Sequence, residues 1–357
     1  MNFFKSLAMV GLVSLASVYA DSPSPKLPDK EKLIQYSESM DELLQNFECS
    51  FTKRLKLLPE WYELHSGDPV IRNKDGYNDI VEVLYRRNDP KWFFRISNIT
   101  DDDNSQHYQY GRHFDGTIFW DNNEHPHSRK IVIYNQLPNV PIFIERLLSR
   151  FPSDNDGYCR VSQSEIPIEK VPSLKSILNN PENEIRILPI NDKSFKVMAI
   201  QLNLKHPFKG MNRLKEFYFE TNQQKLRLVK YHPTAMYINN GEEYIFHPLM
   251  EVTFSDFKKV SGSHIDVPMN IQTVFLSEET KKYTNQISTA DDLINLDKAG
   301  WKVPIQEETV AFSSFNKEFS FEKGDIAFNY DAGTEYWDQR DKKKHRVGET
   351  NAPSKSP

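Results

Sequence analysis

The sequence is short of glycine, of net charge and of long apolar runs, and each shortage excludes a class of protein. Only 13 glycines accompany 23 Phe, 16 Tyr and 5 Trp among 357 residues, which favours packed β structure over a low-complexity chain. The formal net charge of -5 offers no basic face for nucleic acid. After the N-terminal segment, no stretch approaches the ~20 apolar residues that a membrane span needs. The composition therefore predicts a globular protein of one large domain or two modest ones.

Residues 1–20 have the pattern of a cleaved secretion signal. A lysine near the start precedes an apolar run over 7–16, and Val18 and Ala20 fit the positions before a signal-peptidase site. An uncleaved membrane anchor is the weaker alternative, because the apolar run is shorter than the ~20 residues of a span. We therefore expect export to the periplasm or the medium, with Asp21 as the mature N-terminus.

Cysteine is also scarce, with two residues in the chain, Cys49 and Cys159. Both lie in the part predicted to be exported, where a disulfide is permitted. Two buried thiols fit a chain of this length equally well, so the pairing of these cysteines stays open.

Alternating apolar and polar residues predict an antiparallel sheet centred on residues 213–275. Residues 213–220 and 225–231 flank the polar turn 221–224, which is typical of a β-hairpin. In 249–257 apolar residues again alternate with polar ones, so one face of the sheet is apolar and the other is wet. Similar runs predict further strands at residues 49–58, 80–85, 91–97, 108–114, 117–120, 131–134, 184–188, 194–204, 265–276 and 312–330.

Three segments predict helices, and residues 174–178, with proline on both sides, are a further candidate. Residues 31–47 carry apolar residues at an approximately helical spacing. Residues 141–150 begin with proline and continue with an apolar stripe, and residues 289–296 have the pattern of a short capped helix.

The order of these elements predicts one α+β domain over residues 31–337. The segment 21–30 is rich in Pro and Ser and should form a flexible leader. The segment 338–357 has almost no apolar residue, which predicts a disordered tail.

The sequence shows no catalytic or metal-binding constellation. It lacks Gly-x-Ser-x-Gly, His-Glu-x-x-His and a phosphate-cradling glycine loop. His125-Pro126-His127 offers two imidazoles but no further ligand at zinc spacing, which favours a polar loop. Residues 154–157 resemble the middle of a calcium loop, yet Pro152 and Gln163 stand where its first and last ligands belong. We therefore expect a protein that is not an enzyme and that needs no metal or cofactor.

Several runs follow one another in a recognisable order. An Arg-and-Pro turn leads into an aromatic strand at 86–94 (RRNDPKWFF), and an Asp-Gly turn leads into a strand ending in Trp at 114–120 (FDGTIFW). A Pro-led segment at 139–144, the hairpin at 213–231 and the Phe-Ser-Phe at 319–321 come later. Placed after an amphipathic helix, these runs resemble the LolA-like superfamily of periplasmic lipoprotein carriers and outer-membrane lipoprotein-sorting proteins.

The resemblance implies a strongly curved antiparallel sheet, an incomplete β-barrel, with short helices covering its concave face. It also implies a lipid or lipoprotein as partner. Arg87 is similar to the arginine that tethers the family's lid, and it would hydrogen-bond a lid carbonyl or meet the polar head of a ligand. Compared with the family, this chain is longer, with insertions near 152–183 and 278–310.

We expect an exported, monomeric binding protein that holds an acyl chain, a lipid or a lipoprotein in an apolar pocket. Burial of apolar surface, worth about 25 cal/mol per Å², would drive binding. The alternative is an exported structural or protein-interaction module whose sheet face is filled by its own side chains. The predicted pocket residues are Trp92, Phe94, Leu226, Leu228, Val252 and Phe254 on the strands and Leu43, Leu44, Phe143 and Leu147 on the covering helices.

Overall fold

A computed structural model gives the fold of the chain. It describes residues 27–64, 78–98, 109–125, 128–134, 144, 148–151, 171–202, 211–239, 242–246, 250–276, 289–298, 303–317, 319–321 and 332–347. The predicted secretion signal, Cys159, Phe143 and Leu147 lie outside these residues. Within them, no helix is long and apolar enough to cross a membrane.

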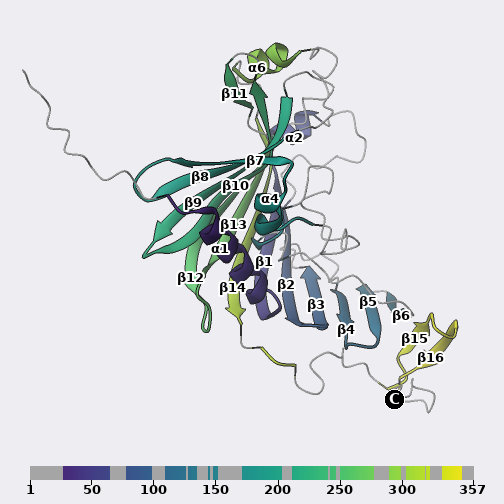
Figure 1. The fold of residues 1–357 in the computed structure, drawn as a ribbon. Coiled ribbons are helices and arrows are strands. Elements are labelled where there is room, and N and C mark those ends of the chain that lie inside the picture. Colours follow the sequence, from purple (N-terminus) through teal and green to yellow (C-terminus); the bar gives the residue numbers. More distant parts are fainter. Residues whose placement is uncertain are drawn as a thin grey trace, which may run out of the picture.

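One large open sheet dominates the structure (Figure 1). Its strands are β1 (Asn46–Leu57), β2 (Asn78–Asn88), β3 (Lys91–Asn98), β4 (Gln109–Phe114), β5 (Phe119–His125), β6 (Ser128–Tyr134), β7 (Asn183–Pro189), β8 (Ser194–Gln201), β9 (Met211–Asn222), β10 (Lys225–Asn239), β11 (Glu243–Phe246), β12 (Met250–Lys259), β13 (Asp266–Leu276), β14 (Pro304–Asn316), β15 (Glu335–Asp338) and β16 (Lys343–Arg346). The helices within the described residues are α1 (Lys30–Leu43), α2 (Pro59–Leu64), α4 (Leu174–Asn179) and α6 (Ala290–Lys298).

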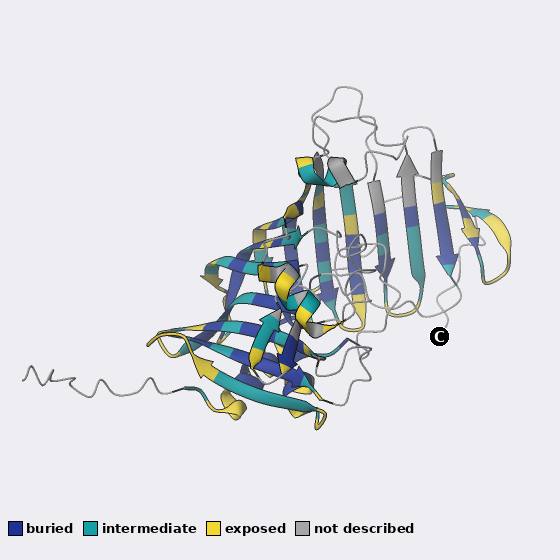
Figure 2. Cartoon of the chain, turned by 90° about the horizontal axis from the view of Figure 1, so that it is seen from above, coloured by how far each residue is buried: buried dark blue, intermediate teal, exposed yellow. Residues whose placement is uncertain are grey.

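The strand order is β16-β15-β6-β5-β4-β3-β2-β1-β14-β13-β12-β10-β9-β8-β7, with β11 paired to β10. Neighbouring strands run antiparallel, apart from β15, which is parallel to β6. The sheet bends between its two halves and does not close (Figure 2). The predicted α+β fold with an open, curved antiparallel sheet is therefore confirmed.

Strand β1 joins the two halves of the sheet. It pairs with β2 on one side and with β14 on the other, so Phe51 lies between Val83 and Phe312. Buried and half-exposed residues alternate along it from Asn46 to Lys53, as the period of a strand with one apolar face requires. Because β14 lies next to β1, its first residues belong to the sheet, although they fall within the segment predicted as an insertion near 278–310.

The β9–β10 hairpin forms where the sequence predicts it. Gln223 and Gln224 both have positive φ, at 47° and 67°. Two such residues match a type I′ turn, whose twist suits the flanking strands. Asn222 and Lys225 pair directly across the turn, which fixes the register of the two strands.

Helix α1 begins directly after its N-cap residue, Asp29, and ends earlier than predicted. The Asp29 carboxylate accepts a hydrogen bond from the Lys32 amide at 2.9 Å, which satisfies an amide at the helix start. The predicted end at residue 47 is wrong, because Phe47 already belongs to β1. There its ring meets Tyr85 edge to face at 5.1 Å and stacks on Phe315 at 5.4 Å. Aromatic packing on the sheet outweighs continuation of the helix.

The other predicted helices are described to different extents, and the candidate at 174–178 forms α4. Helix α6 forms as predicted, and Thr289 and Asp292 exchange reciprocal side chain to backbone hydrogen bonds of 2.8 and 3.2 Å at its start. Of residues 141–150, Ile144 and Leu148 are helical and buried in the main core. The residues between them lie outside the described part of the chain, so the rest of this predicted helix stays a prediction.

The tail predicted to be disordered from residue 338 instead forms a hairpin as far as it is described. Strand β15 adds to the edge of β6, with Trp337 opposite Val132, and β16 pairs with β15. Tyr336 is buried against Ile131 and Ile133. One buried aromatic ring and ion pairs between strands order a segment whose composition alone predicts disorder.

We expect Tyr336→Ala to release this hairpin from the edge of the sheet. Loss of a buried aromatic side chain costs about 3 kcal/mol, enough to open an edge element without unfolding the rest of the protein. Limited trypsin digestion read by intact mass should show faster cleavage in β16, with an almost unchanged melting temperature. Trp337→Ala removes a ring that is 42% exposed and serves as the matched control. Equal protection in both variants would contradict this packing.

Candidate ligand-binding site

The inner face of the sheet carries one large apolar core. The helices α1 and α4 lie side by side on this face (Figure 1), and both contribute residues to the same cluster. All six predicted strand residues are buried in it, at exposures between 0% and 5%, together with Leu43 and Leu44. Their predicted role as ligand contacts stays a prediction. The strand residues are Trp92, Phe94, Leu226, Leu228, Val252 and Phe254.

Helix α1 fills part of this face. The ring of Tyr36 meets Phe219 edge to face, with centroids 5.5 Å apart and an interplanar angle of 89°. Burial raises the pKa of the Tyr36 hydroxyl, although a hydrogen bond with the Leu228 backbone opposes the shift. The region around Leu228 is therefore packed by the protein's own side chains.

Arg87 also lies on the inner face, at the end of the sheet where α1 meets β1. It is directly opposite Phe47 on β1 and Trp92 on β3. Its guanidinium donates to both carboxylate oxygens of Asp89, at 2.7 and 3.0 Å. The predicted lid contact of Arg87 stays a prediction, because most of residues 141–150 lie outside the described part of the chain.

A buried ion pair, which the sequence patterns did not predict, interrupts the apolar face. Lys53 Nζ lies 2.8 Å from Glu308 Oε2, and the two residues are 8% and 2% exposed. Val81 lies opposite Lys53, and Thr273 lies opposite Glu308. The burial of Lys53 could have been predicted from the alternation in β1, because Lys53 lies on the same face as Phe51.

The cavity of interest lies away from the predicted pocket residues, between α4 and strands β7 to β10. Its volume is about 340 Å³. Ile177 and Ala199 belong both to its wall and to the main core cluster, so the cavity borders the apolar face. The lining residues are Pro172, Ser176, Ile177, Asn180, Asn183, Ala199, Gln201, Arg213, Leu214, Lys215, Pro233 and Ala235.

The cavity has a cationic lining. Arg213 and Lys215 contribute two positive charges, and no Asp or Glu is among the described residues that line it. The signal in the sequence is again the strand period, because Arg213 and Lys215 alternate in step with the buried Phe217 and Phe219. Such a lining suits a ligand that combines a negative group with apolar surface.

A polar network occupies the other face of the same strands. His232 Nδ1 lies 3.0 Å from Glu216 Oε2, and His232 Nε2 lies 3.1 Å from Glu251 Oε2. Burial lowers the pKa of His232, but hydrogen bonds to the two carboxylates outweigh it and raise the pKa above 6.5. The hydrogen bond to His232 in turn lowers the pKa of Glu251 to about 2. Lys196 and Lys230 complete the network with ion pairs to Glu216 and Glu251.

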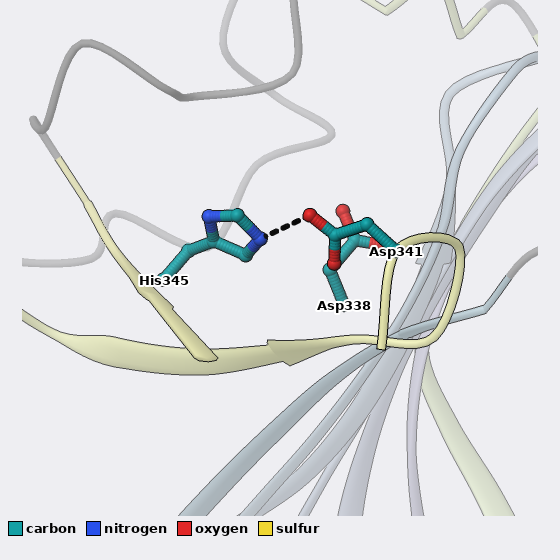
Figure 3. Close-up of side chains that lie close together, drawn as sticks. All are labelled: Asp338, Asp341 and His345. Carbon is teal, nitrogen blue, oxygen red and sulfur yellow. Dashed lines mark hydrogen bonds and ion pairs between the residues drawn. The ribbon is translucent and has the colours of Figure 1, made fainter. Parts of the chain in front are cut away.

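A second cluster of ionisable groups lies in the C-terminal hairpin (Figure 3). Ligand atoms of Asp338, Asp341 and His345 lie within 4.8 Å of one another. However, the Arg340 guanidinium binds both oxygens of Asp338, and His345 Nε2 lies 2.7 Å from Asp341 Oδ2. The guanidinium already supplies the cation, so this cluster is best explained as an ion-pair network that holds the turn.

Similarity to known proteins is slight. No family model matches the chain, and no curated protein matches it. Among solved structures, a DUF1329 family protein from Desulfovibrio piger aligns with 82% of this chain and 94% of its own chain, at a TM-score of 0.36 and 8% sequence identity. A likeness at these values carries no inference about function, so the function has to be inferred from the residues of this chain.

We expect the contribution of His232 to stability to decrease as the pH rises. Because its pKa is raised in the folded state, protonated His232 stabilises the fold fully below pH ~6.5, and this stabilisation is lost as the pH rises through the folded-state pKa. Replacing it with Asn should cost roughly 1–3 kcal/mol at pH 5.5, since buried Glu216 loses a partner. Urea unfolding between pH 5 and 9 measures the difference from wild type.

The control for this prediction is His264→Asn. His264 is exposed in the turn between β12 and β13. A difference between wild type and His232→Asn that grows with pH would contradict the assignment.

Proposed function

We propose that the protein is an exported, non-enzymatic binding protein that holds an acyl chain, a lipid or a lipoprotein against the inner face of its sheet. The observation that carries the proposal is a large, mainly apolar face, covered by helices, that borders a cavity of about 340 Å³. Ligand sites in proteins have volumes of roughly 300–1,000 Å³. The cavity is therefore large enough for a small amphiphile or for one end of a larger one.

Three further features support the proposal. The secretion-signal pattern of residues 1–20 favours export, and the absence of known catalytic motifs from the sequence favours binding over catalysis. The sequence also resembles the LolA-like carriers, and α1 covers the inner face as that resemblance leads one to expect. We infer a monomer with a lipid or lipoprotein partner.

The second candidate function is a structural or protein-interaction module with a filled core. The packing of Tyr36 against Phe219 and Leu228 favours it, because side chains of α1 fill that part of the inner face. The two functions differ in the α4 cavity. A carrier takes ligand there, whereas a module does not.

We expect gently purified protein to carry lipid, detected by native mass spectrometry, and to take up a fluorescent fatty acid after delipidation. Ala199→Phe should abolish uptake, because the added ring would occupy the cavity that Ala199 lines. Filling an existing cavity changes stability less than overpacking a dense core, which costs roughly 1–3 kcal/mol.

The matched control is Ala311→Phe. Ala311 is exposed on β14 and does not line the cavity, so this variant should bind like the wild type. If the delipidated wild type takes up no probe and no lipid co-purifies, the carrier function is wrong and the module function stands.

A further inference from the structure

We propose that the α4 cavity is an anion site that recognises the carboxylate or phosphate head group of a single-chain amphiphile, with Arg213 and Lys215 as the recognising residues. This inference rests on the proposed function and specifies the chemistry of its ligand.

The first argument is a change in polarity along the inner face of β8 and β9. The register places Phe195 opposite Phe219 and Val197 opposite Phe217, so these four residues form an apolar stretch. The next two pairs on the same face are Ala199 with Lys215 and Gln201 with Arg213. The face thus passes from aromatic to cationic over a few residues, as the two ends of an anionic amphiphile do.

The second argument is the way in which Lys215 is held. Its Nζ donates to the Phe151 carbonyl oxygen at 3.2 Å and to the Tyr231 hydroxyl at 3.3 Å, and it lies 6.0 Å from the centre of the Tyr231 ring. These hydrogen bonds orient the ammonium at the cavity wall, where it adds a second positive charge to that of Arg213.

The third argument is Arg213. Its side chain is exposed, and it forms no ion pair within the described part of the chain. It directly faces Gln201, which adds an amide donor to the same wall. A guanidinium can bind a carboxylate or phosphate through two parallel hydrogen bonds, so the Arg213 and Gln201 pair suits either head group.

Helix α4 and strand β7 contribute neutral polar groups to the cavity wall. Asn183 Nδ2 donates to the Ile177 carbonyl oxygen at 2.9 Å, and the Ser176 hydroxyl donates to the Ser173 carbonyl oxygen at 2.8 Å. These hydrogen bonds fix the polar side chains that face the cavity. A negative group entering there meets two cations and, among the lining residues that the structure describes, no carboxylate.

The test compares decanoate, decyl phosphate and 1-decanol by isothermal titration against delipidated full-length protein. The wild type should bind the two anions more tightly than the alcohol. Arg213→Gln should weaken both anions by about tenfold or more, because a hydrogen bond to a charged group is lost, and should change decanol binding by less than about twofold. Arg213→Lys should retain part of the preference. Lys215→Met provides a second, independent removal of charge.

The matched control is Lys193→Gln, which removes one exposed positive charge from the turn between β7 and β8, outside the cavity. It should leave all three affinities unchanged. An anion preference that survives both Arg213→Gln and Lys215→Met overturns the head-group site, while continued binding of decanol leaves the proposed function intact. Binding of none of the three probes overturns the proposed function itself. Displacement of decanoate by inorganic phosphate at equal concentration shows a simple anion site and overturns the amphiphile assignment.

Discussion

The need to cover one apolar face is the constraint on which the rest of this structure depends. An open sheet cannot bury its inner face against itself, so α1 and α4 pack on that face and share one core with it. Burial at about 25 cal/mol per Å² stabilises this arrangement. The open sheet also leaves two edges, and each limits further pairing. The edge strand β16 carries Lys343 to Arg346, and β7 ends in Pro189.

Local patterns in the sequence predicted the features that depend on neighbouring residues. The period of two in β10 and β12 placed Leu228 and Val252 on the buried face, and the cap at Thr289 predicted α6. The position of β14 beside β1 could not be predicted, because pairing over such a separation leaves no local signal. The ordered tail was missed for a related reason, since Tyr336 is ordered by residues of β6 that are distant in the sequence.

The candidate site was not predicted because charged residues are usually assigned to the solvent-exposed face of a strand, whereas Arg213 and Lys215 share a face with buried aromatic residues. A lysine is usually assigned to the solvent-exposed face of a strand. The alternation in β1 nevertheless places Lys53 on the buried face, where Glu308 compensates its charge. Taking such a pair out of water costs several kcal/mol per ion, and good geometry only offsets that cost. A pair of this kind is therefore weak evidence for stability. Its presence shows that the inner face tolerates polar groups at defined positions.

The same reasoning explains why the two halves of the inner face differ. Under α1, aromatic residues such as Phe47 and Tyr36 fill the space, and the sheet face becomes ordinary core. The arrangement near α4 differs. This helix has only 6 residues, and a cavity remains between it and strands β7 to β10, beside Lys215 and Arg213. Because α4 is short, it leaves space beside the residues of β8 and β9 that change from apolar to cationic. The cavity and the positive charges therefore lie together. The binding specificity that we propose would therefore depend on this end of the sheet, while the packed end supplies the stability that keeps the cavity in place.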